Sequence, residues 1–303
     1  MATIAVMGAS GNIGGKITEH LLAGGHTVRA IGRSAEKLAG ARARGAEVLL
    51  GDAADAAFLT KAFTGADGVF TLLPPNLGSP DARAEMDRVG TSIAEAIGKS
   101  GVGHAVALSS IGADVPSGTG PIAGLHAHEA RLKRLTGTSV LVLRPGFFFE
   151  NFLHSLDLIR HQGINGSGAA GRTTLPMIAT QDIAAFAARA LAAREWNGFQ
   201  VRELLGPRDL SFDEATRIIG ATIGKPDLAY VQFPYADYSA ALQQAGLSKS
   251  VADLYAELDK AFDDGIVRSI EGRTDANTTP TTLEEFADVI AQAYRGSARA
   301  AGA

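Results

Sequence analysis

Cysteine is absent from this sequence of 303 residues, and its absence removes several classes of chemistry at once. Without a thiol the chain cannot carry a disulfide scaffold, a thiolate nucleophile, a cysteine-based zinc site or an iron–sulfur cluster. A chain of this length still buries a large core, and the ordinary domain size of ~100–200 residues favours one large domain plus a smaller one. We therefore expect a globular protein without covalent cross-links.

An excess of positive charge and a long apolar run are also missing. The chain has 28 Lys and Arg residues against 32 Asp and Glu residues, a net charge of −4. Nucleic-acid binding needs a basic surface, so no nucleic-acid partner is expected. No apolar stretch approaches the ~18–20 residues of a membrane helix, and no basic segment precedes the first apolar run, as it would in a signal peptide. We expect no membrane partner and a soluble, cytoplasmic protein.

Two periodicities alternate over the first 145 residues. Short runs of β-branched and apolar residues recur, and longer segments rich in Ala, Leu, Glu, Lys and Arg separate them. Apolar strands that alternate with amphipathic helices predict an α/β fold with a parallel sheet covered on both faces. The expected strands are Thr3–Met7, Thr27–Ile31, Glu47–Leu50, Gly68–Leu73, His104–Leu108 and Ser139–Leu143. The expected helices are Asn12–Ala23, Ala35–Ala43, Asp81–Lys99 and His126–Leu135.

The rhythm changes after Pro145, where a phenylalanine-rich segment leads into a glycine-rich loop at Gly163–Gly171. We predict an N-terminal domain over residues 1–150, to which residues 180–205 return, and a smaller, mostly helical substrate domain over residues 151–303. The end of the chain, Gly296–Ala303, is expected to be frayed. The elements expected here are helices at Gln181–Arg194, Phe212–Ile223, Ser248–Phe262 and Leu283–Tyr294 and strands at Phe199–Leu204 and Leu228–Gln232.

The most informative motif is the glycine-rich turn between the first strand and the first helix. Glycines at positions 8, 11 and 14 allow a tight turn, a close approach of main-chain N–H groups to a pyrophosphate, and close packing of helix on strand. The helix N-terminus adds free donors and the positive end of its dipole. An ordinary glycine-rich loop is the alternative. We favour a Rossmann-type, doubly wound sheet that binds a dinucleotide through Gly8, Ser10, Gly11, Asn12, Ile13 and Gly14.

The end of the second strand indicates which dinucleotide is bound. NAD-specific folds usually place a carboxylate there to hold the ribose 2′-hydroxyl. This chain has Arg33 at that place and Lys37 one helical turn further. A guanidinium binds phosphate oxygens with two parallel N–H groups, which suits a 2′-phosphate. We predict a preference for NADP(H) over NAD(H), and the alternative is a solvated arginine at a helix start.

Further cofactor contacts are expected where other strands end, because the carboxyl ends of parallel strands share one edge of the sheet. Prolines at such places are equally plain turn formers. The expected residues are Asp52 and Ala53 for the adenine, Leu72, Leu73 and Pro74 for the path of the cofactor, and the backbone of Pro145, Gly146 and Phe147 for the nicotinamide.

Several short motifs resemble the NmrA-like group of atypical short-chain dehydrogenase/reductases. The resemblance covers about residues 2–205, and its most specific part is an Arg-Pro-Gly-Phe segment followed by Glu-Asn. It implies an NAD(P)H-dependent quinone or azo-dye reductase, or an NADP-sensing regulator without catalysis. The motifs are Gly32-Arg33 with Lys37, Gly51-Asp52 with Asp55, Gly65-Ala66-Asp67 and the segment Leu143–Asn151.

A Tyr-x-x-x-Lys pair, which typical short-chain dehydrogenases use to exchange a proton with the substrate oxygen, is missing. The first tyrosine is Tyr230, and no tyrosine is followed four residues later by lysine. When the positions of that tyrosine and lysine are counted back from Arg144, they fall on Ile122 and His126, and neither side chain can replace the original one. A simple ketone would leave a strongly basic alkoxide without a proton donor. The sequence therefore predicts hydride transfer to an electron-poor acceptor such as a quinone, whose reduced anion needs little protonation.

Two side chains are candidates for catalysis. Ser109 ends the fifth strand and is placed to reach the substrate or the nicotinamide ribose, unless it only satisfies loop backbone groups. His126 or His128 is a candidate to face the nicotinamide as proton donor or orienter, with His126 favoured. The two cannot share one helix face because two residues turn ~200° on a helix, which also argues against a metal site. The alternative is a pair of surface or half-buried helix histidines with Glu129 as an acid of the first turn. Arg144 is expected to pair with a nearby carboxylate.

Aromatic residues beyond the sixth strand predict a pocket for a flat, conjugated small-molecule substrate, with plain core as the alternative. Among them we expect Phe148 and Phe233 to contact the substrate. Two hypotheses remain: an NADPH-dependent reductase, and a non-catalytic protein in which bound dinucleotide reorders the loops around Pro74 and Gly163–Gly171. The sequence leaves a homodimer open.

Overall fold

A seven-stranded sheet organises the part of the chain that the computed structural model describes, which is the backbone of residues 1–300 and the side chains of residues 1–296. Its order is β10-β6-β5-β4-β1-β2-β3, and every neighbouring pair is parallel. The predicted α/β, doubly wound fold is confirmed. The strands are β1 (Thr3–Met7), β2 (Thr27–Gly32), β3 (Glu47–Leu50), β4 (Gly68–Thr71), β5 (His104–Leu108), β6 (Ser139–Pro145) and β10 (Phe199–Leu204).

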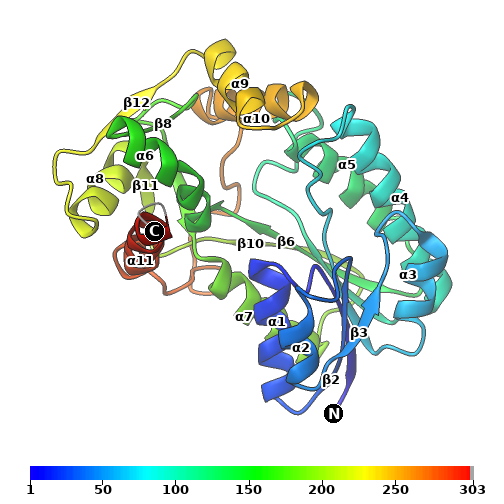
Figure 1. Ribbon diagram of the computed structural model, residues 1–303. Helices are drawn as coiled ribbons and strands as arrows, with labels where there is room; N and C mark the ends of the chain where they lie inside the picture. Colours follow the sequence, from blue (N-terminus) through cyan, green and yellow to red (C-terminus); the bar gives the residue numbers. More distant parts are fainter. Residues whose placement is uncertain (301–303) are drawn as a thin grey trace.

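Helices cover both faces of this sheet (Figure 1). Successive residues of a strand point to opposite faces, so each strand contributes to two cores. Ile4 and Val6 of β1 lie in the core beneath α1, α2 and α7, whereas Ala5 and Met7 lie in the core beneath α3, α4 and α5. The helices are α1 (Asn12–Ala23), α2 (Ala39–Ala43), α3 (Ala56–Phe63), α4 (Ala82–Ser100), α5 (Ile122–Leu132) and α7 (Thr180–Ala193).

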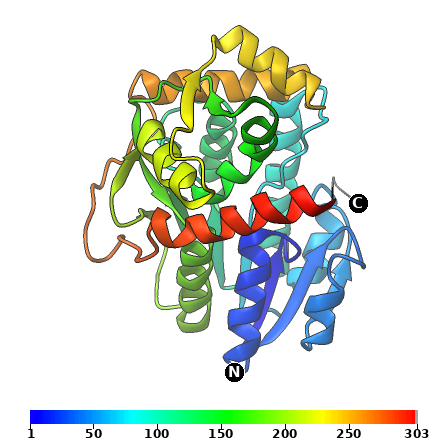
Figure 2. The same cartoon turned by 60° about the vertical axis from the view of Figure 1, so that its left-hand side comes forward.

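The rest of the chain forms a second layer, here called the cap, beside the carboxyl edge of the sheet. A separate apolar core holds it together, and Figure 2 shows α9 and α10 at its top and α11 along its lower side. The cap helices are α6 (Leu156–Gln162), α8 (Phe212–Thr222), α9 (Tyr235–Gln244), α10 (Lys249–Asp263) and α11 (Leu283–Ala300). Its strands are β7 (Phe147–Phe148), β8 (Ile164–Ser167), β9 (Thr174–Ile178), β11 (Asp209–Ser211) and β12 (Ala229–Gln232).

One expectation for the cap needs correction, and two strand pairings were missed. The segment Gly163–Gly171 is not only a loop, because β8 lies within it and pairs in parallel with β12. The antiparallel pairing of β11 with β9 and the parallel pairing of β7 with β9 were not predicted either. The partner strands lie far apart in the sequence, so local periodicity does not reveal them.

Several helix boundaries also differ from the prediction, three of them by four residues or more. Helix α2 begins at Ala39 rather than Ala35, because the preceding residues form a turn in which Lys37 N donates to Ser34 Oγ at 3.3 Å. Helix α5 begins at Ile122 rather than His126, directly after Pro121, a residue whose fixed φ suits a helix start. The predicted fraying from Gly296 is wrong as far as Ala300, where α11 ends, and residues 301–303 lie outside the described part.

The return of the chain to the sheet places two further elements beside the predicted site. After the first cap strands the chain forms α7, which packs against α1, and then β10, which pairs with β6 along its whole length. The division into two domains stays a prediction. In the part of the chain that the structure describes, no helix is long and apolar enough to cross a membrane.

Candidate functional site

The carboxyl ends of β1, β2, β3, β4, β5 and β6 meet at one edge of the sheet, on the side where the cap lies (Figure 1). The strand order reverses between β1 and β4, and open α/β sheets bind ligands at such a reversal. The residues predicted to bind a cofactor follow these strand ends. The fold therefore brings them to one edge, which we call the crevice edge.

The glycine turn has the geometry that a dinucleotide needs. Gly8 adopts φ +64°, a conformation that favours glycine, and Gly11 N donates to Gly8 O at 2.9 Å to close the turn. A Cβ at Gly14 would lie 2.4 Å from Gly8 O, so helix α1 approaches the turn as closely as backbone allows. Ser10 and Asn12 are exposed.

Helix α1 presents a free N-terminus at this turn. Its first N–H groups have no intrahelical partner, since the first α-helical bond runs from Gly15 N to Gly11 O. No acidic residue lies in the first turn, so no carboxylate of the helix neutralises the positive end of its dipole. Ile13 is buried beneath the turn, which leaves only its backbone for a ligand. The arrangement can hold an anion at α1.

The other predicted lining residues follow the ends of β3 and β4, and one of them contacts the turn. A Cβ at Gly8 would lie 2.8 Å from Leu72 Cδ2, so Leu72 packs directly against the turn. Leu73 and Pro74 are half-buried. Asp52 accepts a hydrogen bond from Ala54 N at 2.9 Å, and Ala53 is half-buried. Asp52 thus already serves the local turn with one oxygen, and its role toward an adenine stays a prediction.

Arg33 and Lys37 differ from the other basic residue of this region. Both side chains are exposed, and neither makes an ion pair with any described side chain. Arg29, which lies on β2 itself, already has protein partners. It donates to Ala62 O and Thr64 O and pairs with Glu47 at 3.3 Å. The Arg33 guanidinium, which lies next to the crevice edge, is therefore free to bind a ligand.

Ser109 and Arg144 converge on one buried carboxylate, that of Glu129 on α5. Ser109 Oγ donates to Glu129 Oε1 at 2.5 Å, and Arg144 donates to both carboxylate oxygens, at 3.0 Å and 2.6 Å. All three residues are buried. Burial by itself lowers the pKa of Arg144, but Glu129, with further negative charge from Asp114 and Glu203, raises it overall. The predicted pairing of Arg144 with a carboxylate is confirmed.

The two histidines of α5 point in different directions, as the helix rotation predicts. His126 is half-buried, and its Nδ1 lies 2.8 Å from Ala113 O. His128 is buried against α4, where burial and the nearby Arg131 charge lower its pKa to about 4. Among the described residues no group of His, Asp and Glu is arranged to hold a metal ion. His128 is thus a core residue on the side of α5 away from the crevice edge.

The exit of β6 is built by backbone rather than by side chains. A Cβ at Gly146 would lie 2.2 Å from Pro176 O, so only glycine fits there, and Pro145 O accepts from Ile111 N at 3.1 Å. The Phe147 ring points into the cap core, where its centroid lies 5.4 Å from that of Phe212. Any contact of Phe147 with a nicotinamide is therefore left to its backbone.

The two predicted substrate residues both have packing roles. Phe148 packs against the sheet core beneath α1 and α7. The Phe233 ring lies so close to Gly166 that a Cβ there would approach it to 2.8 Å, and Phe233 N donates to Ser167 O. These contacts do not place either ring against a substrate, and both roles stay predictions.

The sequence reasoning missed Glu129, which it treated as an acid of the first turn. Helix α5 begins at Ile122, so Glu129 lies two turns inside it, on the same face as His126. The spacing of three residues between His126 and Glu129 was the available signal. It was misread because the helix start was placed four residues too late.

A second missed feature ties the cap to the loop after β4. Ser248 N donates to Leu77 O at 2.9 Å, and Ser248 Oγ donates to Ser79 O at 2.5 Å. At the start of α4, Ala82 N donates to Ser250 Oγ at 3.0 Å. The corner between α9 and α10 thus holds the loop that follows Pro74, on the opposite side from the covalent connection at β6. No local sequence pattern signals this contact.

Glu150 is a third residue that sequence reasoning did not assign. Both of its carboxylate oxygens accept from Thr180 N at 3.1 Å, and Thr180 Oγ1 donates to it as well. Burial raises the pKa of Glu150, against the opposite effects of the Thr180 hydrogen bonds and the Lys16 charge. The residue fixes the start of α7 to the segment that leaves β6.

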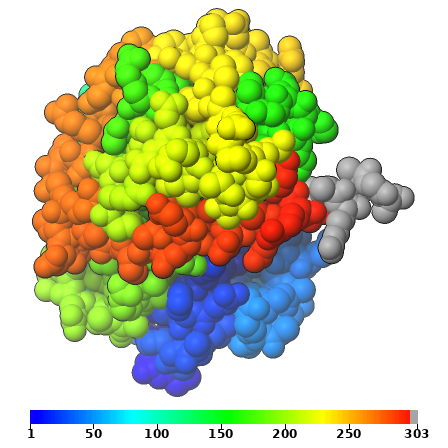
Figure 3. Space-filling view, turned by 90° about the vertical axis from the view of Figure 1, so that its left-hand side faces the viewer, coloured from blue at the N-terminus to red at the C-terminus, as the bar shows by residue number. Residues whose placement is uncertain are grey.

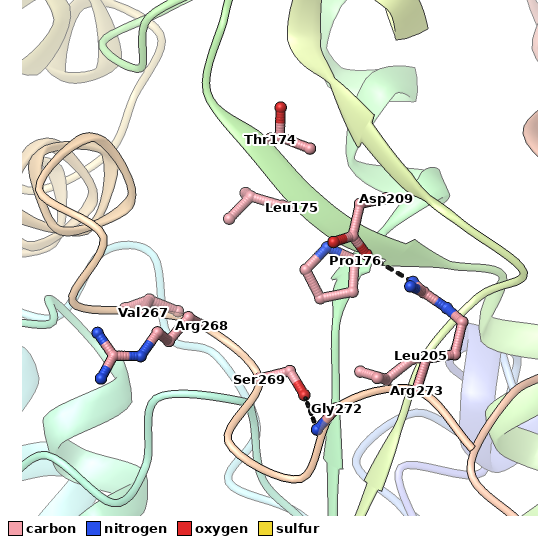
Figure 4. Close-up of a pocket in the computed structure, with 10 residues that line it drawn as sticks. All are labelled: Thr174, Leu175, Pro176, Leu205, Asp209, Val267, Arg268, Ser269, Gly272 and Arg273. Atoms are coloured by element: carbon pink, nitrogen blue, oxygen red, sulfur yellow. Dashed lines mark hydrogen bonds and ion pairs between the residues drawn. The ribbon is translucent and has the colours of Figure 1, made fainter.

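One hollow of the surface is lined by Leu205, which follows β10, and by Pro176, whose carbonyl approaches Gly146. It has a volume of about 260 Å³ and sits under the segment Val267–Arg273, which we call the strap (Figure 4). In Figure 4 Arg273 turns toward Asp209, to which it donates at 2.5 Å. A wider groove of about 440 Å³ borders α7 and α11, and Figure 3 shows α11 along the boundary between the cap and the N-terminal elements. Neither hollow includes a predicted site residue.

Comparisons with known proteins agree with the fold. The model of the NmrA-like family matches residues 1–287. The NAD(P)H azoreductase of Xenophilus azovorans is 28% identical over 297 residues, which cover 96% of this chain and 99% of that protein. The NADPH-dependent quinone oxidoreductase of Escherichia coli in complex with NADPH is 26% identical, with a TM-score of 0.80 and coverage of 95% and 99%. The negative transcriptional regulator NmrA in complex with NADP shares the fold, with a TM-score of 0.74, 16% identity and coverage of 100% and 98%.

Proposed function

The chain belongs to the NmrA-like family, and we propose that it is an NADPH-dependent reductase that transfers a hydride to an electron-poor acceptor such as a quinone. The observation that carries the proposal is the free N-terminus of α1 behind the glycine turn, with the unpaired Arg33 beside it. The azoreductase and the quinone oxidoreductase described above support an NAD(P)H-dependent oxidoreductase.

The residues at the crevice edge fit a dinucleotide. Gly8, Gly11 and Gly14 place no side chain on the turn, and the N–H groups at the start of α1 can bind a pyrophosphate. A bound reduced nicotinamide supplies the hydride. The backbone of Pro145 and Gly146 would back its ring, and the packing of Leu72 on the turn keeps the path beside it apolar.

The preference for NADPH over NADH rests on Arg33, with Lys37 nearby. A planar guanidinium can donate two N–H groups to a 2′-phosphate, and no carboxylate ends β2 to favour a free 2′-hydroxyl. Calorimetric titration of both dinucleotides tests this. We expect Arg33→Ala to weaken NADPH binding roughly tenfold to a hundredfold, the range for a charge-assisted hydrogen bond, and to leave NADH binding nearly unchanged.

Arg42→Ala is the matched control, because Arg42 is an exposed arginine on α2 that lies further from the end of β2. It is expected to bind both dinucleotides like the wild type. Equal losses for NADPH and NADH in Arg33→Ala would contradict the reading of Arg33 as a phosphate ligand. Failure of the wild type to bind either dinucleotide would contradict the proposed function as a whole.

The proposed acceptor class follows from the protons that the site can offer. Ser109 directs its proton at Glu129, and His126 has one ring nitrogen on Ala113 O. Helix α5 contains no tyrosine. An acceptor whose reduced anion is stable, such as a quinone, needs no protein acid in the hydride step, whereas a simple ketone does.

A steady-state assay of NADPH consumption separates these acceptors. Quinones are expected to be reduced, and simple ketones to give rates at least a hundredfold lower, which is the low end of what general acid catalysis contributes. A preference for ketones would overturn the acceptor assignment. The engagement of Ser109 and His126 by protein partners also favours a second candidate, a binding protein that responds to the dinucleotide, and tight NADPH binding without turnover on any acceptor would select it.

A further inference from the structure

The hydrogen bond of the Ser109 hydroxyl indicates whether this group can donate to a ligand or accept from it, which the sequence alone does not show. Its oxygen lies 2.5 Å from Glu129 Oε1, and both residues are buried. A hydroxyl has one proton to donate and two lone pairs that accept. If Glu129 accepts the Ser109 proton, only the lone pairs of Ser109 Oγ remain for a ligand; if Glu129 donates, the proton of Ser109 remains as well.

Glu129 has no proton to give in this arrangement. Arg144 Nε and Nη2 donate to its two oxygens, at 3.0 Å and 2.6 Å, so the guanidinium pairs with an ionised carboxylate. An ionised carboxylate only accepts hydrogen bonds. The short contact with Ser109 is therefore a hydrogen bond that Ser109 donates, and the free valences of Ser109 Oγ are acceptors.

Backbone pairing holds Ser109 beside the exit of β6. Ser109 N donates to Leu143 O at 2.7 Å, and Ile111 N donates to Pro145 O at 3.1 Å. The pairing of β5 with β6 thus continues past the end of β5, and Ser109 lies next to the backbone of Pro145 and Gly146. This is where the proposed function places the nicotinamide half of the dinucleotide.

We propose that Glu129 is a positioning residue that sets Ser109 as a hydrogen-bond acceptor for the nicotinamide nucleoside, so that Ser109 recognises a ribose hydroxyl or the carboxamide N–H rather than protonating the substrate. The proposal rests on the proposed dinucleotide binding. According to it, Ser109 and Glu129 contribute to binding of the nicotinamide half of the cofactor, and Arg33 contributes to binding of the adenosine half.

Two ligands test this without any turnover. NADPH carries the nicotinamide nucleoside, whereas adenosine 2′,5′-bisphosphate carries the 2′-phosphate and adenine without it. Ser109→Ala is expected to weaken NADPH binding roughly threefold to tenfold, the worth of one neutral hydrogen bond, and to leave the affinity for adenosine 2′,5′-bisphosphate unchanged. Arg33→Ala is expected to weaken the binding of NADPH and of adenosine 2′,5′-bisphosphate by the same factor.

Glu129→Gln tests the positioning role, because an amide in place of the carboxylate puts an N–H group where Ser109 or Arg144 now finds an acceptor. We expect Glu129→Gln to weaken NADPH binding to about the same extent as Ser109→Ala does. The double variant is expected to show no additional loss of NADPH affinity. Asp114→Asn is the control: Asp114 lies 3.8 Å from Arg144 Nη1 and does not hydrogen-bond Ser109. It is expected to bind both ligands like the wild type.

The reduced 3-acetylpyridine analogue of NADPH, which lacks the carboxamide N–H, distinguishes the two sources of the donor. If Ser109 accepts from the carboxamide, Ser109→Ala removes the discrimination of the wild type against this analogue. If it accepts from the ribose, the discrimination stays. Either result supports the proposal.

An unchanged NADPH affinity in Ser109→Ala, or equal losses for NADPH and adenosine 2′,5′-bisphosphate, overturns it. Should Glu129→Gln not fold, Ser109→Ala alone decides, and its affinity for adenosine 2′,5′-bisphosphate reports that its crevice edge is intact. Failure of the proposed function looks different, since the wild type would then bind neither ligand.

Discussion

At the scale of single residues, the glycines of the first turn are required for different reasons. Gly8 is needed for its backbone conformation, with φ +64°. Gly14 is needed for space, because a Cβ there would lie 2.4 Å from Gly8 O and 2.8 Å from Met7 O. Gly15 is the next residue of α1, and its Cβ would meet only Ala9 O, at 3.4 Å. Sequence spacing identified the motif, and the structure separates these roles.

Gly14→Ala is therefore expected to push α1 away from the turn. Overpacking of this kind costs about 1–3 kcal/mol of the free energy of unfolding, and the displaced N–H groups should weaken NADPH binding roughly tenfold or more. Chemical denaturation and calorimetric titration measure the two effects.

Gly15→Ala is the matched control, since alanine is favoured over glycine by ~0.4–1 kcal/mol at a helical position with room for the methyl group. Wild-type or higher stability with unchanged NADPH affinity is expected. If Gly14→Ala behaves like this control, the close approach of α1 to the turn does not matter for binding.

At the scale of elements, strand β10 and the strap depend on one buried carboxylate. Glu203 of β10 accepts from Ile270 N at 2.9 Å, from Glu271 N at 3.2 Å and from Ser269 Oγ. It is 1% exposed and adds to the negative charge around Arg144. The strap is irregular, and most of it is exposed apart from the buried Val267. The Glu203 carboxylate is thus one of its attachments, besides the hydrogen bonds of Arg273 to Gly206 O and Asp209.

Removing the carboxylate should release the strap. Glu203→Ala leaves the two backbone N–H groups without their acceptor, which costs about 1–3 kcal/mol of the free energy of unfolding. Trypsin is expected to cut faster after Arg268 and Arg273, the exposed basic residues of the strap. Denaturation and timed proteolysis check both effects.

Glu271→Ala serves as the control, because the Glu271 side chain is exposed and makes no ion pair with a described residue. Wild-type stability and proteolysis are expected for it. Equal cleavage rates in Glu203→Ala and the wild type would show that the strap is held by its other contacts, such as that of Arg273 with Asp209.

Whole elements could be predicted where a local pattern repeats. Strands β1, β3 and β5 and helix α1 have the bounds that the sequence analysis gave, because each is one apolar or amphipathic run between turn residues. Strands β8 and β9 could not be predicted in this way. Strand β8 contains a glycine and β9 a proline, and both form strands only because β12, β7 and β11 offer partners.

At the scale of the whole molecule, two buried groups give stability opposite dependences on pH. Burial lowers the pKa of His128 from 6.5 to about 4, so the unfolded chain holds the extra proton between these values and stability falls as pH drops. Burial raises the pKa of Asp259 from 3.8 to about 6, so the folded protein holds the extra proton and stability falls as pH rises through 6. Each shift corresponds to roughly 3 kcal/mol.

The two effects offset each other between about pH 4 and pH 6, and single variants should reveal them. His128→Asn is expected to be more stable at pH 5 than at pH 7, because only the Asp259 effect remains. Asp259→Asn is expected to be less stable at pH 5 than at pH 7. Urea denaturation at the two pH values measures this, and parallel profiles for both variants would contradict the assignment.

The sequence by itself determined the parallel sheet, the turn behind which α1 begins, and the arginine at the end of β2. These features depend on residues within one βα unit, and the spacing of glycines and apolar residues fixes them locally. Only the tertiary structure decided that Glu129 holds Ser109 and Arg144, and that Ser248 holds the loop after β4. These contacts join residues 15 to 169 positions apart, and their geometry exists only once sheet, helix and cap have packed together.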